Sequence, residues 1–467
     1  MIAFARQPTR TCCLLATFAV SFVMSACGGP DTLIAGDIAF IDVNVLPMDS
    51  EHVLEDQVVV IQDGRIIAIG SANDIGPEEG VEVIDGDDFY LMPGLTEMHG
   101  HLPDPRQSDV DIKNVLFLYV ANGVTTVRGM QGDPSQFRMR EQIRHGLLIG
   151  PQLYLASRSM NGDLVSVAAE AEQRVREYKV DGYDLLKVHE GLTVEAFHAL
   201  AETAKEVGIP FAGHVPDEVG LRGALAAGQR SIDHLDNYIE ALVPDAFQPD
   251  SPVGLRGVGE LMTIVDESLM SDLVEATVDA GTWVVPTMVL WETAFFNERG
   301  SSEVLLERPE TKYMPPETVE RWIKAVDDRF ESTDIDTNRR VAALRRFVLM
   351  ALHEGGANIA LGTDSPQVFS VPGFAIHHEM ALYVELGMTP YEVLEIATRR
   401  PAEYFEAVDD FGMVAEGQRA DLLLVTDNPF DDIRNVANRA GVMLNGRWFS
   451  ETEIENRLDE MARFYGN

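Results

Sequence analysis

The chain has 467 residues, 46% of them hydrophobic, so it is long enough and apolar enough to bury a large core. Its 76 acidic and 36 basic residues give a formal net charge of −40, which argues against nucleic acids and anionic lipid surfaces as partners because both would repel it. We expect a solvated acidic surface around one large domain with an appendage, and a small molecule as the partner.

The first 27 residues are typical of an export signal. Arg6 and Arg10 form a basic start, residues 14–24 are mostly apolar, and Cys27 follows small residues. The apolar stretch is shorter than the ~20 residues that cross a bilayer. The segment resembles a bacterial lipoprotein signal, which predicts a lipid on Cys27 and a periplasm-facing lipoprotein of the cell envelope, in the outer membrane. Ordinary secretion with a free Cys27 is the alternative.

Residues 33–92 alternate apolar and polar positions between turn signals, which predicts a small β unit. Within it, the pair Asp63-Gly64 between two apolar runs predicts a hairpin. A similar β texture returns in residues 404–467. We expect the two segments to join in one composite β-sandwich domain.

Between these segments, residues 93–403 carry short apolar strands that alternate with helical patterns, which is typical of βα units and a parallel sheet. Residues 194–205 are one such helix, which should end at Gly208. The expected fold class is α/β, a (β/α)8 TIM barrel. Its strands are expected near residues 94–99, 124–129, 152–157, 184–189, 210–215, 231–235, 283–288 and 358–364.

Two histidines stand at the end of the first barrel strand. His99 and His101 are two residues apart, and the two-residue period of a strand points both imidazoles to one face. Two such rings can share a metal ion at about 2.0–2.1 Å each. This pair is the first candidate for a metal site.

Three more candidates end later strands: His214, His234 and Asp364. Either histidine alone could be a hydrogen-bonded core residue, and the aspartate alone could be a helix N-cap. Barrel enzymes build their sites where strands end. The shared placement therefore favours metal ligation, with Asp364 also moving protons.

Lys187 lies inside a segment that reads as a buried strand. A buried ammonium beside two dications would be strongly disfavoured. Carboxylation by CO₂ would convert it into an anionic carbamate that bridges two metals. The alternatives are a side chain that reaches the surface or pairs with Asp184.

At this point the chain resembles the amidohydrolase superfamily, and within it the imidazolonepropionase-like and Xaa-Pro dipeptidase (prolidase) branch. The resemblance covers most of the chain after the signal. The motifs that carry it are Asp63-Gly64-Arg65-Ile66, Pro93-Gly94-Leu95, His99-Gly100-His101, Phe411-Gly412-Met413-Val414 and Ala420-Asp421-Leu422.

The resemblance implies two divalent ions, with Zn²⁺ the expected metal, and a hydroxide between them as the nucleophile. His99 and His101 with Asp364 would hold one ion, His214 and His234 the other, and carboxylated Lys187 would bridge them. The expected catalytic residues are Asp364 and His234. Dipeptidase-like members carry such a lysine, whereas imidazolonepropionase and many deaminases use one metal.

Substrate contacts are less clear from the sequence. Candidates are Arg128 at the end of the second predicted strand, Arg158 after the third, and Tyr238 just past His234, and a cation there could bind a carboxylate. Each could equally be structural. His189 could contact substrate, reach a metal or merely end its strand.

The remaining histidines are expected to support the fold. His198 lies on the helix of residues 194–205, where it should pack or face solvent. The run His377-His378-Glu379, after the eighth strand, should support the site rather than bind metal.

The leading hypothesis is a hydrolase of C–N bonds in small amides, such as Xaa-Pro-like dipeptides or N-acyl amino acids. A one-metal cyclic amidase or deaminase is the second hypothesis, and a binding lipoprotein without activity is the third. The sequence is compatible both with a monomer and with a homo-oligomer.

Overall fold

The computed structural model describes Met1 and residues 30–249, 254–295, 302–331 and 334–466. The expected signal, with the lipidation residue Cys27, lies outside the described residues apart from Met1, so that interpretation stays a prediction. In the part of the chain that the structure describes, no helix has both the length and the apolar character needed to cross a bilayer.

One eight-stranded sheet contains strands from both ends of the chain, with the order β18-β17-β16-β7-β2-β3-β4 and with β6 paired to β2. The central seam is antiparallel between β16 and β7, where Leu423 lies opposite Met92. The strands of this sheet are β2 (Ile38–Val45), β3 (Leu54–Gln62), β4 (Arg65–Ser71), β6 (Glu82–Asp85), β7 (Tyr90–Pro93), β16 (Leu422–Val425), β17 (Arg439–Leu444) and β18 (Arg447–Ser450).

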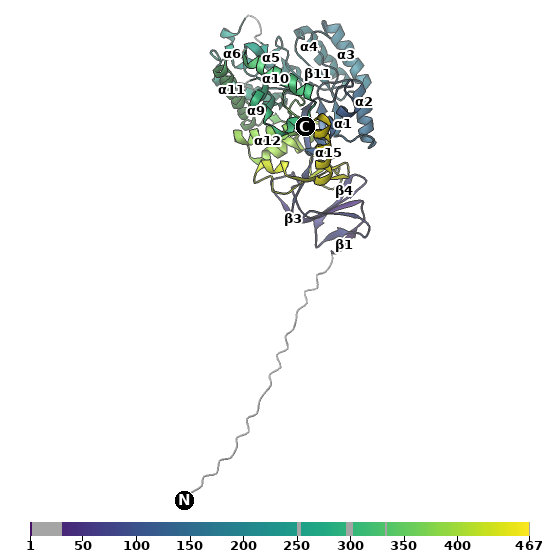
Figure 1. Ribbon diagram of the computed structural model, residues 1–467. Coiled ribbons are helices and arrows are strands. Elements are labelled where there is room, and N and C mark those ends of the chain that lie inside the picture. Colours follow the sequence, from purple (N-terminus) through teal and green to yellow (C-terminus); the bar gives the residue numbers. More distant parts are fainter. Residues whose placement is uncertain (2–29, 250–253, 296–301, 332–333, 467) are drawn as a thin grey trace.

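A smaller sheet of β1 (Thr32–Ile34) and β5 (Ile75–Pro77) packs on this sheet. Figure 1 shows β1, β3 and β4 together at one end of the molecule and most helices grouped at the other. The predicted hairpin joins β3 to β4. Its two turn residues, Asp63 and Gly64, have φ of 51° and 73°, the left-handed backbone that a tight hairpin turn requires.

Eight further strands run parallel, in two sheets ordered β10-β9-β8 and β11-β12-β13-β14-β15. Most of their residues are buried, as in strands covered on both faces. Their bounds are β8 (Leu95–Gly100), β9 (Val124–Gly129), β10 (Gln152–Leu155), β11 (Leu186–Val188), β12 (Phe211–Gly213), β13 (Ser231–Asp233), β14 (Trp283–Val285) and β15 (Asn358–Ile359).

Hydrogen bonds connect the two parallel sheets on both sides. Between β10 and β11, the N–H of Ser157 donates to Leu185 O at 2.9 Å. Between the chain after β15 and β8, the N–H of Asp364 donates to His99 O at 2.7 Å. The expected strand 358–364 is regular only over its first two residues, and at its expected end Asp364 has a φ of 59°, outside strand geometry.

The helices fall mainly between the parallel strands. The longer ones before β15 are α1 (Asp109–Ala121), α2 (Ser135–Arg144), α3 (Ala168–Asp181), α4 (Val194–Val207), α5 (Gly220–Ala227), α6 (Gly254–Leu261), α7 (Met270–Ala280), α10 (Pro316–Glu331) and α11 (Ile335–Glu354). The later ones are α12 (Phe374–Leu386), α13 (Pro390–Ala397), α14 (Arg399–Tyr404) and α15 (Glu451–Tyr465). Short helical turns are α8 (Met288–Leu290), η1 (Glu240–Leu242), η2 (Asp245–Phe247), η3 (Glu267–Leu269), η4 (Trp291–Phe295), α9 (Ser302–Leu306), η5 (Pro309–Tyr313) and η6 (Ile433–Ala437).

Helix α4 follows the sequence prediction closely. The Thr193 side chain caps its first turn by accepting from the N–H of Ala196, and Gly208 ends it with a left-handed φ of 69°. Helix α15 was not predicted. It begins after the N-cap Ser450, directly after β18, and buries Ile454 and Leu458. These two residues are four apart, which is the spacing of one helix face.

Candidate metal centre

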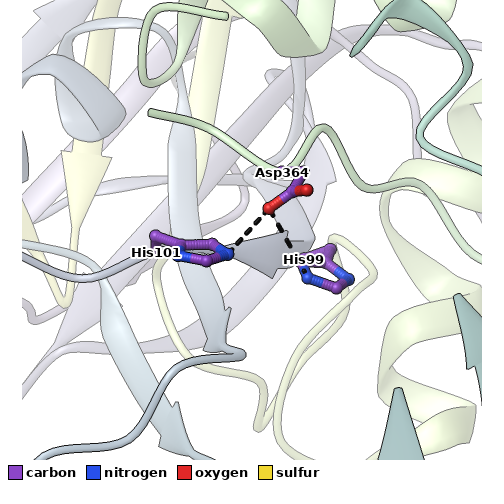
Figure 2. A group of neighbouring side chains, drawn as sticks. All are labelled: His99, His101 and Asp364. Atoms are coloured by element: carbon purple, nitrogen blue, oxygen red, sulfur yellow. Dashed lines mark ion pairs between the residues drawn. The ribbon is translucent and has the colours of Figure 1, made fainter. Parts of the chain in front are cut away.

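His99, His101 and Asp364 converge where β8 and the chain after β15 end (Figure 2). Asp364 Oδ1 lies 2.7 Å from His101 Nε2 and 3.6 Å from His99 Nε2. One ligand atom from each residue lies within 4.8 Å of the others. These three side chains therefore have the geometry to hold one metal ion.

The first two histidines each have an oxygen atom close to Nδ1. His99 Nδ1 lies 2.8 Å from Asp233 Oδ2, and His101 Nδ1 lies 2.8 Å from Gln131 Oε1. A carboxylate or amide oxygen only accepts, so these contacts favour the tautomer with the proton on Nδ1 and the lone pair on Nε2, where a metal ion could replace the direct contact between His101 Nε2 and Asp364 Oδ1. An imidazole held in this way is prepared to bind a metal through Nε2.

His214 and His234 also have an oxygen atom close to Nδ1. His214 Nδ1 lies 2.8 Å from Asp236 Oδ2, and His234 Nδ1 lies 2.8 Å from Thr287 Oγ1. The His234 ring is 4.5 Å from that of His99 and 4.6 Å from that of His214, between centroids. Four imidazoles from three strand ends thus form one group.

Lys187, from β11, is buried in this group, with Nζ 3.3 Å from His99 Nε2. Burial lowers the pKa of its amine, although Asp233 and Asp364 act in the other direction. The structure contradicts both alternatives for this lysine. Its side chain does not reach the surface, and Asp184 pairs with Arg140 at 2.8 Å instead.

Two glycines make room for these ligands. A Cβ on Gly213, which has a φ of 118°, would lie 2.6 Å from Val188 O and 2.9 Å from Lys187 Cδ. A Cβ on Gly362 would lie 2.8 Å from the backbone N of His99. Only glycine fits at either position without displacing a candidate ligand.

Charge in the group also suits a cation. Burial would raise the pKa of Asp364, but His99 and His101 outweigh burial and lower the pKa to about 2. Burial also lowers the pKa of His99 and His234. Metal binding needs this combination of neutral imidazoles and an ionised carboxylate.

Left-handed backbone also occurs at the site. His234, Thr287 and Asp364 have φ of 64°, 48° and 59°. Left-handed backbone is uncommon outside glycine and costs most in a β-branched residue such as threonine. Asp364 also precedes α12 by several residues, so it is not the N-cap of that helix.

The group lines a cavity of about 340 Å³. All six predicted metal ligands contribute to its wall. The remaining wall comes from His189 and Glu190 and from Met130, Gln131, Ser159, Leu290, Trp291 and Gln367.

The structure contradicts the prediction that Arg128 binds substrate. Its side chain is fully buried and donates to both oxygens of Asp233, to Ser231 and Tyr404, and to the Met98 carbonyl. With its donors engaged inside the strands, this guanidinium has a structural role. The sequence indicated only that the residue ends a strand.

The prediction that Tyr238 contacts substrate is also wrong. It is fully buried, and its hydroxyl lies 3.0 Å from Thr277 Oγ1 on α7 rather than at the cavity. Arg158 is exposed and lines an adjoining cavity of about 770 Å³, which shares Gln131 and Ser159 with the metal-site cavity. Arg158 is therefore near the site but not at the ligand group.

His198 and His378 lie apart from the ligands. His198 is exposed on α4, and His378 pairs with Glu310 at 2.7 Å. Glu379 accepts from the N–H groups of Met288 and Val289, each at 2.7 Å, at the start of α8. Neither His378 nor Glu379 lines the metal-site cavity.

Sequence reasoning missed the side chains that orient the ligands, chiefly Asp233, Asp236 and Thr287. One signal was present: Asp233 and Arg128 are opposite charges inside two strands that otherwise read as buried. Buried charges are almost always paired. Thr287 gave no such signal, since a threonine after a strand is ordinary.

The family comparison agrees with this architecture. The model of the Amidohydrolase family matches residues 90–449, and the chain belongs to that family. This confirms the predicted superfamily.

Individual relatives are distant. A dihydroorotase of Pediococcus pentosaceus is 29% identical over 177 residues, which span 36% of this chain and 40% of that protein. An ochratoxinase of Aspergillus niger is 23% identical over 84% of this chain and 81% of its own length.

Solved structures show the same fold. A bottromycin amidohydrolase has a TM-score of 0.69 at 23% identity and covers 92% of this chain and 90% of its own. A Xaa-Pro dipeptidase with methionine bound in its active site has a TM-score of 0.62 at 21% identity, over 88% of this chain and 99% of its own.

Proposed function

We propose that this protein is a two-metal hydrolase of C–N bonds in small amides. The observation that carries the proposal is the shared orientation of four histidines. His99, His101 and His214 have Nδ1 at a carboxylate or amide oxygen and His234 has Nδ1 at the Thr287 hydroxyl, an arrangement in which all four can offer Nε2 to one cavity. Lys187 and Asp364 add a nitrogen and an oxygen to the same wall.

The fold supports this proposal. The two parallel sheets are hydrogen-bonded to each other on both sides, as expected if the strands close into a (β/α)8 barrel over residues 93–403. The composite sheet would then be part of a β-sandwich made from residues 33–92 and 404–467. Enzymes with such barrels place their sites at the C-terminal ends of the strands, where the six candidate ligands lie.

The donor set fits two divalent ions, with zinc as the proposed metal. His99, His101 and Asp364 would hold one ion, and His214 and His234 the other. A carbamate on Lys187 would bridge them, since the lysine lines the same cavity as the four histidines and its nitrogen lies 3.3 Å from His99 Nε2.

The bound metals would supply Lewis acidity and lower the pKa of water toward neutrality. Asp364 would accept the proton of the attacking water and pass it to the leaving amine, because its oxygen faces the cavity. His234 would stay neutral beside it, held by Thr287.

The cavity suggests a substrate no larger than a dipeptide or an N-acyl amino acid. Arg158 lies in the adjoining cavity, which shares two wall residues with the metal site. We propose that it attracts the substrate carboxylate. Proteins similar in fold are titled a Xaa-Pro dipeptidase and a bottromycin amidohydrolase, which places peptide-like amides first for testing.

A one-metal cyclic amidase or deaminase is the second candidate. The close spacing of the first group favours this candidate. Among the described residues, His99, His101 and Asp364 are the only group of three or more His, Cys, Asp or Glu side chains whose ligand atoms all lie within 4.8 Å of one another. In this case Lys187 would not carry a carbamate.

The test is a screen of dipeptides, N-acyl amino acids, cyclic amides and deaminase substrates, with protein loaded with zinc and bicarbonate. Hydrolysis of linear amides that is lost on chelation supports the first proposal. Activity limited to cyclic amides or amines supports the second. No turnover in any class by fully loaded protein contradicts both.

We also propose that the protein is anchored to the outer membrane, facing the periplasm, through a lipid on Cys27. Labelled palmitate should be incorporated by the wild type and not by Cys27→Ser. Equal labelling of both would contradict this proposal.

A further inference from the structure

His189 is hydrogen-bonded in the opposite sense to its neighbours in the cavity. The backbone N–H of Glu190 donates to His189 Nδ1 at 2.8 Å. The other four histidines of the cavity place Nδ1 against an oxygen that can accept. The His189 ring therefore has a different hydrogen-bonding pattern at Nδ1 from the other four rings of the cavity.

The bond from Glu190 fixes which nitrogen of His189 carries the proton. A backbone N–H can only donate, so Nδ1 must offer its lone pair and the ring proton sits on Nε2. An Nε2–H group has no lone pair for a metal. His189 is thus excluded as a further nitrogen ligand, one of the roles that the sequence left open.

The His189 ring lies beside the candidate metal ligands. His189 follows Lys187 by two residues and lines the same cavity. Its centroid lies 4.3 Å from that of His214. Within the described part of the chain, no hydrogen bond involves its Nε2, so this N–H is available to a ligand.

We propose that His189 is a catalytic residue whose Nε2–H donates to the carbonyl oxygen of the scissile amide. As the oxygen of water bonds to the carbonyl carbon, the π electrons move to the carbonyl oxygen. A donor already in place stabilises that charge more than the neutral carbonyl. No bond to His189 forms or breaks. This inference rests on the proposed amide hydrolysis.

The first test needs neither metal nor substrate. ¹⁵N spectra of histidine-labelled, metal-free protein should show the His189 ring with the proton on Nε2. The resonance is assigned by its loss in His189→Phe. A proton on Nδ1 would overturn the inference.

The second test compares three variants of the metal-loaded protein on the best amide found for the wild type. His189→Phe should keep its metal content and lose about 10²–10³-fold in kcat, with a smaller change in KM, as when one oxyanion donor is removed. His189→Gln, which keeps an N–H donor, should recover part of that loss. His198→Ala, on the exposed face of α4, should match the wild type.

A tetrahedral phosphonate analogue provides a readout that a structural role would not change. Its affinity should fall in His189→Phe by about the same factor as kcat/KM, while product affinity changes little. Wild-type kcat in His189→Phe would overturn the inference about His189 but not the proposed function. A wild-type protein that hydrolyses no amide would instead overturn the proposed function on which it rests.

Discussion

Asp233 connects the buried charge of Arg128 to the metal centre through His99. Its Oδ2 lies 2.8 Å from His99 Nδ1, and its two oxygens lie 3.1 and 3.0 Å from Arg128 Nη2. Burial would raise the pKa of Asp233, but Arg128 and Lys187 outweigh burial and lower it. The carboxylate therefore stays ionised and fixes the imidazole for metal binding.

Asp233→Asn should weaken both the fold and the metal site. The change leaves a buried guanidinium without its counter-charge, which costs about 3–5 kcal/mol in stability. Metal affinity should also fall about 10- to 100-fold because the orienting acceptor is weakened. Urea unfolding of the metal-free protein and zinc titration measure the two effects. Glu206→Gln, which removes an exposed partner of Arg176, is the control and should change neither.

Thr287→Val tests the orientation of His234 alone. Valine has the shape of threonine but cannot accept from His234 Nδ1 or from Trp291 Nε1, which lie 2.8 and 3.2 Å from Thr287 Oγ1. We expect a loss of about 10-fold or more in affinity for the second metal ion. Thr282→Val removes another buried hydroxyl, one that donates to Gln229 O, and zinc binding should be unaffected. Equal affinities in the two variants would contradict the assignment.

Gly213→Ala should displace Lys187. The new methyl group would lie 2.6 Å from Val188 O and 2.9 Å from Lys187 Cδ, so we expect lower metal occupancy in addition to a loss of stability. Gly182→Ala is a matched control, because Gly182 also has positive φ, 91°, but nothing lies within 4 Å of the added Cβ. Both variants should lose about 1–3 kcal/mol through backbone strain. Only Gly213→Ala should lose metal.

Glu379 should make the protein less stable as the pH rises toward neutrality. Burial raises the pKa of its carboxyl from 4.5 to about 7, although hydrogen bonds from Val289 and Met288 lower it. Within this window the folded protein keeps a proton that the unfolded chain has released, so the free energy of unfolding decreases with pH.

The Glu379→Gln variant has no ionisable group at position 379, so its comparison with the wild type isolates the effect of this carboxyl. From about pH 5 to about pH 8, the metal-free wild type should lose up to about 3 kcal/mol relative to the variant. Urea unfolding at both pH values is the measurement. Glu385→Gln, on the exposed side of α12, should keep the wild-type dependence. Parallel slopes for the wild type and Glu379→Gln would show that the carboxyl is ionised throughout.

The strands and the six candidate ligands could be predicted because their signals are local. His99 and His101 share a face through the two-residue period of a strand, and Gly208 ends α4 through its own φ. The convergence of His214, His234 and Asp364 follows from the rule that parallel strands end at one edge. None of these steps needs the positions of distant side chains.

The contacts around the ligands could not be predicted in the same way. Arg128 lies near the end of a strand, a position that a substrate-binding residue can also occupy. Only the structure shows that its side chain is buried and pairs with Asp233. His189 has the same sequence context as a ligand, and one backbone N–H decides its role. Such choices depend on atoms from several elements at once.

The metal content of the wild type and of Lys187→Ala tests the central claim most directly. Both are loaded with zinc and bicarbonate and analysed for zinc per chain beside their amide hydrolysis. The account predicts about two ions for the wild type, because the donor set divides into two groups. It predicts at least one ion fewer, with most activity lost, for Lys187→Ala. Two ions and wild-type turnover in Lys187→Ala would contradict it.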